Sequence, residues 1–114
     1  MSGTEFELFI YRAIRRRFPQ YEGWEILEQP TLDSGARPDF VVRGNSRTAV
    51  IDAKDKENLE PSDIDRIIEY ANELHAHWVI IYIANDTYVS DAVQQYADRE
   101  RVEVARTQWR ARQT

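Results

Sequence analysis

The sequence predicts a single α/β domain over residues 1–114. Three segments place apolar residues at helical spacing, and five short runs are apolar or alternate apolar with polar residues, as strands do. Gly, Pro, Asn and Ser gather between these segments, where turns are expected. With 42% hydrophobic residues, a chain of 114 residues can bury one core without disulfides, and it contains no repeat, low-complexity segment or linker.

The N-terminal part is expected to form a helix and a strand. The helix begins after Thr4 and runs to about Arg17, and Pro19 ends it. A strand follows at residues 24–29, where apolar and acidic residues alternate, and then a polar loop at residues 31–37. The apolar face of the helix is formed by Phe6, Ile10, Ala13 and Ile14.

The middle of the chain predicts two adjacent strands. Residues 39–43 and 48–54 are short apolar runs with β-branched content. Residues 44–47, Gly-Asn-Ser-Arg, have the composition of a tight hairpin. The two strands are therefore expected to be antiparallel neighbours.

The C-terminal part is expected to form two helices and two strands. A charged segment at residues 55–61 leads to a helix that Ser62 caps and that ends near His75. Residues 78–84 are nearly all apolar, which is typical of a central strand covered on both faces. The buried stripe of the helix is Ile64, Ile67, Ile68, Ala71 and Leu74, and a third helix and last strand are expected at residues 90–99 and 102–106.

Composition and charge exclude several classes of protein. The chain has no cysteine, which excludes a structural thiolate zinc site and a disulfide framework. No apolar run is long enough to span a membrane, and the N-terminus lacks a signal-peptide pattern, so we expect a soluble, intracellular, cytoplasmic protein with no membrane partner. A net charge of −5 argues against nonspecific coating of nucleic acid, because phosphate-backbone affinity comes largely from basic patches.

Two acidic residues and a lysine form the chemical signal of this chain. Side chains alternate along a strand, so Asp52 and Lys54 share one face, and the hairpin can bring Asp39 beside them. Two carboxylates in a partly buried site repel each other unless a cation lies between them, and Mg²⁺ suits a few carboxylate oxygens together with water and phosphate. Lys54 and Lys56 are the only lysines among fifteen basic residues. Lysine can act on water where arginine, which keeps its proton, cannot.

Pro38-Asp39 opening one strand and Asp52-Ala53-Lys54 within the next resemble the PD-(D/E)XK nuclease superfamily, roughly from Gly3 to Arg106. The resemblance implies a restriction endonuclease-like core, an αβββαβ mixed sheet flanked by helices. It also implies a nuclease, an endonuclease by preference, that hydrolyses DNA phosphodiester bonds with Mg²⁺, for which Mn²⁺ can substitute. Asp39, Asp52 and the Ala53 carbonyl are then expected metal ligands, and Lys54 positions or activates the attacking water.

A glutamate on the first helix commonly completes the metal site in this superfamily, and the chain offers two. Glu7 lies at the edge of the apolar face, whereas Glu5 points to the solvated side. We therefore expect Glu7 to serve as the further ligand and catalytic residue. A helix N-terminal glutamate stabilised by the macrodipole is the alternative, and both roles can hold at once.

The second helix departs from one branch of the superfamily. Repair and recombination nucleases often carry Gln-x-x-x-Tyr there, and the matching positions read Arg66-Ile-Ile-Glu-Tyr70. Arg66 either contacts a phosphate or forms an ion pair with Asp63, Glu69 or a neighbour of Tyr70 on a solvated face, and the ion pair is the favoured interpretation. Other residues expected to bind duplex or branched DNA are Arg37, Arg43 and, as a support, Lys56.

Three further expectations complete the sequence-based interpretation. His75 and His77 do not share a helix face and are not expected to bind a metal together. The segment 107–114, with Trp109 between arginines, either stacks on bases or frays, and fraying is favoured. Compact relatives are often homodimers, so a homodimer through the third helix or the Trp78 region is expected.

Two alternatives to an enzyme stay open. The fold can persist as a catalytically inactive DNA-binding or assembly module. The chain can also be an acidic interaction domain whose motif is coincidental, which predicts that Asp39 and Asp52 lie far apart in space.

Overall fold

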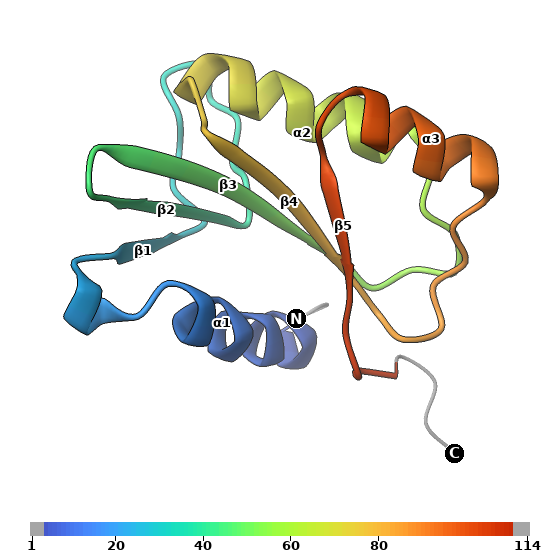
Figure 1. The fold of residues 1–114 in the computed structure, drawn as a ribbon, viewed down its shortest axis with the longest axis horizontal. Coiled ribbons are helices and arrows are strands. Elements are labelled where there is room, and N and C mark those ends of the chain that lie inside the picture. The colour runs from blue at the N-terminus through green and yellow to red at the C-terminus, as the bar shows by residue number, and fades with distance from the viewer. Residues whose placement is uncertain (1–3, 111–114) are drawn as a thin grey trace.

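A five-stranded mixed sheet lies between one helix on its first face and two helices on its second (Figure 1). The computed structural model describes residues 4–110. The elements are α1 (Thr4–Arg17), a 3₁₀ turn (Gln20–Glu22), β1 (Glu25–Glu28), β2 (Phe40–Gly44), β3 (Arg47–Lys54), α2 (Pro61–Leu74), β4 (Trp78–Ile83), α3 (Asp91–Arg99) and β5 (Glu103–Arg106). The predicted α/β class and order of helices and strands are confirmed.

The strands lie in the order in which they occur along the chain. β1, β2 and β3 form an antiparallel meander, and β4 and β5 then pair parallel to β3. The parallel pairs are connected through α2 and α3, which cross the same face of the sheet (Figure 1). As a result, β3 lies between an antiparallel and a parallel neighbour, and it carries the Asp-x-Lys motif.

The β2–β3 hairpin sets the register of the motif strands. Asn45 and Ser46 have φ angles of 54° and 61°, which is the left-handed conformation of a two-residue hairpin turn with the twist that strands favour. Gly44 pairs with Arg47 at the turn, and Phe40 pairs with Ile51 at the open end. This register places the residue before β2 next to the C-terminal end of β3.

Two hydrophobic cores hold the layers together. Alternate residues of the central strands face α1 on one side and α2 and α3 on the other, as expected for strands covered on both faces. β4 shows this alternation clearly, because Ile80 and Tyr82 join the α1 core while Ile81 and Ile83 join the other. The α1 side contains Phe6, Ile10, Ile14, Phe18, Phe40, Val42, Ala49 and Ile51, and the opposite side contains Val41, Val50, Leu59, Ile64, Ile67, Val93 and Val102.

Gly44 is required by the close approach of a neighbouring segment. A Cβ at this position would lie 2.4 Å from the Gly23 carbonyl oxygen and 3.0 Å from Cε3 of Trp24. We therefore expect Gly44→Ala to lower the free energy of unfolding by about 1–3 kcal/mol, because backbone must move to relieve the overlap. Urea denaturation measures the change, and Gln95→Ala, on an exposed position of α3, is the control that should stay within about 0.5 kcal/mol of the parent.

The start of α2 differs from the prediction. Ser62 does not cap the helix; Glu60 is the N-cap and Pro61 is the first helical residue, a position where the missing N–H of proline costs nothing. The Asp63 carboxylate accepts a hydrogen bond from the Glu60 N–H at 2.8 Å. The start predicted for the third helix, at residue 90, agrees with the structure, in which Ser90 is the N-cap of α3 and its hydroxyl accepts a hydrogen bond from the Val93 N–H.

The segment after β5 packs against α1 instead of fraying. Trp109 lies 5.9 Å from the ring of Phe6 and 5.7 Å from the ring of Phe9, centroid to centroid, and its carbonyl accepts a hydrogen bond from the Asn85 N–H. The prediction that this segment frays is therefore wrong up to Arg110, and residues 111–114 lie outside the described part.

Within residues 4–110, no helix has the length and apolar character needed to cross a membrane.

Candidate functional site

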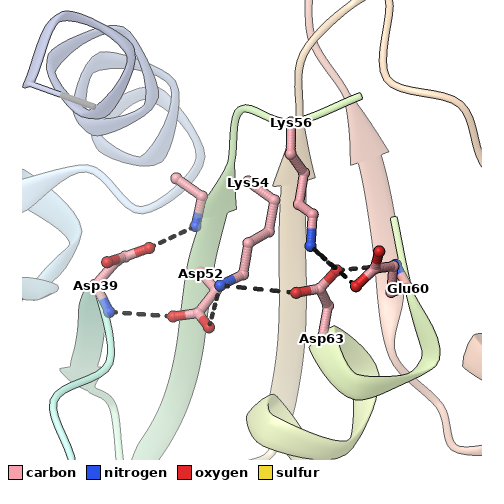
Figure 2. A network of polar contacts seen from close by, with 7 residues as sticks. Asp39, Asp52, Lys54, Lys56, Glu60 and Asp63 are labelled. Carbon is pink, nitrogen blue, oxygen red and sulfur yellow. Dashed lines mark hydrogen bonds and ion pairs between the residues drawn. The ribbon is translucent and has the colours of Figure 1, made fainter. Parts of the chain in front are cut away.

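The two aspartates of the motif lie side by side at the open end of the β2–β3 hairpin (Figure 2). The Asp39 N–H donates to Oδ1 of Asp52 at 3.1 Å, and the Ala53 N–H donates to Oδ2 of Asp39 at 2.8 Å. Each carboxylate is thus held by a main-chain group from the other strand. The prediction that Asp39 and Asp52 converge is confirmed, and a coincidental motif with distant aspartates is excluded.

Burial disfavours the charged form of both aspartates, and the charge of Asp39 adds to this effect at Asp52. Burial, followed by the negative charge of Asp39, raises the pKa of Asp52 to about 6, against the opposing effects of the Asp39 N–H, Lys54 and Arg66. Burial also raises the pKa of Asp39, although the Ala53 N–H and Lys54 act in the other direction. Binding of either a proton or a cation therefore stabilises the pair.

Lys54 places an ammonium group between two acidic residues. Its Nζ lies 3.8 Å from Oδ2 of Asp52 and 4.0 Å from Oδ1 of Asp63. Its side chain is 20% exposed, so the ammonium lies at the border between the protein and solvent. The shared face predicted for Asp52 and Lys54 is confirmed.

Lys56 contacts acidic side chains of the protein. Its Nζ lies 2.9 Å from Oδ2 of Asp63 and 3.6 Å from Oε1 of Glu60 (Figure 2). Lys56 lies two residues beyond the end of β3, and its ion pairs connect it to the start of α2. Its expected contact with DNA would require these ion pairs to be shared or exchanged.

Asp63 is a site residue that the sequence interpretation did not identify. It is buried, lies in the first turn of α2, and contacts both lysines of the chain. A signal was present, because Pro61 as the first helical residue makes Glu60 the cap and places an acidic residue three positions later. With Ser62 as the predicted cap, Asp63 is instead the first helical residue and no capping pattern is recognised.

Glu7 lies on α1, close enough to Asp39 for their charges to interact. Burial first, and then the charge of Asp39, raises the pKa of Glu7, while a hydrogen bond from Nε2 of Gln29 at 3.2 Å lowers it. Gln29 also accepts a hydrogen bond from Arg37 at 3.4 Å, which links Arg37 to Glu7. Glu5 is exposed, as expected. A hollow of about 370 Å³ adjoins this position, lined by Glu7, Leu8, Tyr11 and Glu28.

The two remaining arginines of interest differ in their position. Arg43 lies on β2 four residues beyond Asp39, or about 13 Å along the strand, so the structure does not bring it to the aspartate pair. Arg66 forms no ion pair with Asp63 or Glu69, because the ion pairs of Asp63 are with the two lysines. The favoured interpretation of Arg66 is therefore wrong, and its positive charge acts on Asp52 and Tyr70.

The donor set at the hairpin fits a Mg²⁺ ion held mainly by water and two carboxylates. Across residues 4–110 no three His, Cys, Asp or Glu side chains form a preassembled cage. Mg²⁺ does not need one, because it keeps several waters and takes one or two carboxylates. Oδ1 of Asp39 and Oδ2 of Asp52 receive no hydrogen bond from the described residues, so both can serve as ligands. The Ala53 carbonyl points to the same edge of β3 as its N–H, toward Asp39.

The two histidines do not contribute to this site. His77 Nδ1 accepts a hydrogen bond from the Thr48 N–H at 3.1 Å, at the opposite end of β3 from Asp52. His75 caps the C-terminus of α2 in a left-handed conformation. The structure thus shows His77 in a main-chain contact and no shared metal group within the described residues.

Comparison with known proteins supports the fold assignment. No protein-family model and no curated protein matches the chain. Solved structures that match include a repair endonuclease from Pyrococcus abyssi (14% identity, TM-score 0.58, 94% of this chain and 48% of that one). They also include Pyrococcus furiosus SfsA in complex with Ca²⁺ (15%, 0.55, 91% and 55%) and Sulfobacillus thermosulfidooxidans Can2 in complex with cyclic tetra-adenylate (16%, 0.65, 90% and 33%).

These likenesses concern the fold. The chain spans from a third to just over half of these three structures, at identities of 14–16%. The five-stranded mixed sheet with helices on both sides is a nuclease-like fold.

Proposed function

We propose that this domain is a Mg²⁺-dependent nuclease that cleaves DNA phosphodiester bonds as an endonuclease. The observation that carries the proposal is the pairing of Asp39 with Asp52 at the hairpin end, with the Lys54 ammonium 3.8 Å from Asp52. A nuclease-like fold with neighbours that include a repair endonuclease supports it.

The donors proposed for Mg²⁺ are Asp39, Asp52 and the Ala53 carbonyl, with Glu7 joining directly or through water. When bound, the cation would neutralise charge on the scissile phosphate and supply a water that loses its proton readily. Mn²⁺ has compatible ligand preferences and is expected to substitute. The burial of Asp52 and the repulsion between the two carboxylates favour occupation by a cation over the empty, doubly charged state.

Lys54 is proposed to orient the attacking water and to stabilise the negative charge that develops at phosphorus. An ammonium fixed beside the reacting phosphate stabilises that charge without reorganising. Gln29 donates a hydrogen bond to one carboxylate oxygen of Glu7, and the other oxygen is proposed to hold a water. Arg37, which is held by Gln29, is proposed to contact a phosphate near the scissile one.

The proposal is tested by incubating the purified protein with covalently closed circular, linear and branched DNA, with Mg²⁺, with Mn²⁺ or with EDTA. Cutting of the closed circle, which has no ends, in the presence of either metal is the expected result for an endonuclease. If no substrate is cut and calorimetry detects no metal binding, the catalytically inactive DNA-binding or assembly module replaces the proposal. Parallel incubation with single-stranded RNA decides between DNA and RNA as the substrate.

Arg66 is the second proposed phosphate contact. It is exposed, its charge acts on Asp52, and it lacks the ion pairs that its sequence neighbours offered. Arg66→Ala is expected to weaken DNA binding about equally for different sequences and to lower the slope of log K against log salt by roughly one. Fluorescence anisotropy over a salt series measures both, and Arg99→Ala on α3, which stacks on Tyr96, is the matched control with the same charge change. If the slope is unchanged, Arg66 does not contact a phosphate.

A further inference from the structure

Asp63 makes more contacts than a helix cap requires. Its Oδ2 accepts the Glu60 N–H at 2.8 Å, which is the contact that begins α2. The same oxygen lies 2.9 Å from Nζ of Lys56, and Oδ1 lies 4.0 Å from Nζ of Lys54. A capping carboxylate is ordinarily at the surface, but the Asp63 side chain is only 10% exposed.

The two oxygens of Asp63 therefore have different partners. Oδ2 is fixed on one side by main chain and by Lys56, so the orientation of the carboxylate is set by α2. Oδ1 is left facing Lys54, whose ammonium also lies near Oδ2 of Asp52 (Figure 2). Lys54 thus lies between a carboxylate of the hairpin and a carboxylate of the helix.

We infer that Asp63 is a positioning residue that holds the Lys54 ammonium at the Asp39–Asp52 pair, and that Lys56 serves to hold Asp63. This inference rests on the proposed nuclease function for its catalytic consequence. A long, flexible lysine side chain loses rotamer freedom when it acts, and a second, rigidly oriented carboxylate pays that cost before the substrate arrives. Asp63 itself contacts neither the phosphate nor the metal ion in this scheme.

The first test needs neither metal nor substrate. Because the chain contains only Lys54 and Lys56, protein labelled with ¹³C at the lysine ε-carbon gives two assignable side-chain signals in NMR. In metal-free protein, Asp63→Asn is expected to increase the mobility of both ε-methylene groups, seen as lower order parameters. Asp65→Asn is the matched control on the same helix, since Asp65 contacts Tyr96 of α3 and neither lysine.

A glutamate variant separates positioning from helix capping. Asp63→Glu keeps an acceptor at the third position of α2, where glutamate is a favoured capping residue, but its extra methylene displaces the carboxylate. We expect it to retain thermal stability and still to loosen Lys54. Unchanged mobility of Lys54 in both variants overturns the inference, and the glutamate variant keeps the test valid if Asp63→Asn fails to fold.

The catalytic consequence is measured by single-turnover cleavage of plasmid DNA with Mg²⁺. Both Asp63 variants are expected to slow the cleavage step about 10–100-fold, the scale of a small misplacement of a catalytic group, while DNA affinity stays within about twofold. Full-rate cleavage by both variants overturns the inference. If the parent protein cuts no DNA but Asp63→Asn frees Lys54, the proposed function fails while the positioning of Lys54 by Asp63 holds.

Discussion

Lys54→Ala protein is expected to lose DNA cleavage by about a hundredfold or more while it still binds Mg²⁺. Positioned proton-transfer groups contribute roughly 10²–10⁴-fold to rates, and the substitution leaves both aspartates in place. Single-turnover cleavage measures the rate, and titration calorimetry measures metal binding. Removal of the ammonium beside Asp52 also removes a competing positive charge, so metal affinity should be equal to or higher than that of the parent.

The control for this experiment is a variant with the same loss of charge far from the site. Arg99→Ala on α3 removes one positive charge from an exposed position and should cleave DNA at the parental rate. If Lys54→Ala cuts DNA as fast as the parent does, Lys54 has no part in the cleavage step. Loss of metal binding by the variant would instead indicate that Lys54 supports the carboxylates themselves.

Asp52→Asn is expected to abolish cleavage and, in metal-free protein, to change how stability depends on pH. The folded-state pKa of Asp52, about 6, lies above the unfolded value of 3.8, so the folded protein binds the proton more tightly. The stability that this proton contributes is fully present below pH 3.8 and is lost as the pH rises through 6. The parent loses this stability between pH 4 and pH 7.5 and the variant does not. The free energy of unfolding of the variant minus that of the parent should therefore rise by on the order of 3 kcal/mol over this range.

Urea denaturation in EDTA at several pH values measures this difference. Asp98→Asn, on an exposed position of α3, controls for the loss of one carboxylate and should show no comparable gain. Added Mg²⁺ should stabilise the parent at neutral pH by mass action and leave Asp52→Asn unaffected. If the stability of the variant depends on pH as that of the parent does, the pKa of Asp52 is not raised in the folded protein.

Most of the fold was predictable because its signals are local. The apolar spacing of α1, the two-sided apolar run of β4 and the Gly-Asn-Ser-Arg turn each constrain a short segment. The hairpin prediction was sufficient to bring Asp39 and Asp52 together, since its register follows from the turn. The half-buried position of Glu7 and the exposed position of Glu5 followed from the helical repeat in the same way.

The surroundings of Lys54 were less predictable because they depend on where a helix begins in space. Asp63 approaches Lys54 only because α2 starts at Pro61 and crosses the sheet near the end of β3 (Figure 1). The fate of Arg66 depends on the same contact, because Asp63 is engaged by Lys54 and Lys56 and does not pair with Arg66. Competition of several cations for one carboxylate is a property of the packed structure, which no sequence spacing specifies.

The turn at Asn45 and Ser46 also has a consequence for how the protein folds. Asp39 and Asp52 are carried by one hairpin, so the chain closes only a short loop to bring them together, and the entropic cost of that closure is small. Hairpins form within microseconds, well before distant strands such as β5 can dock. The like charges therefore meet early on the folding route, and refolding of the metal-free chain should be faster at pH 5, where Asp52 takes up a proton as its pKa rises toward about 6, than at pH 8.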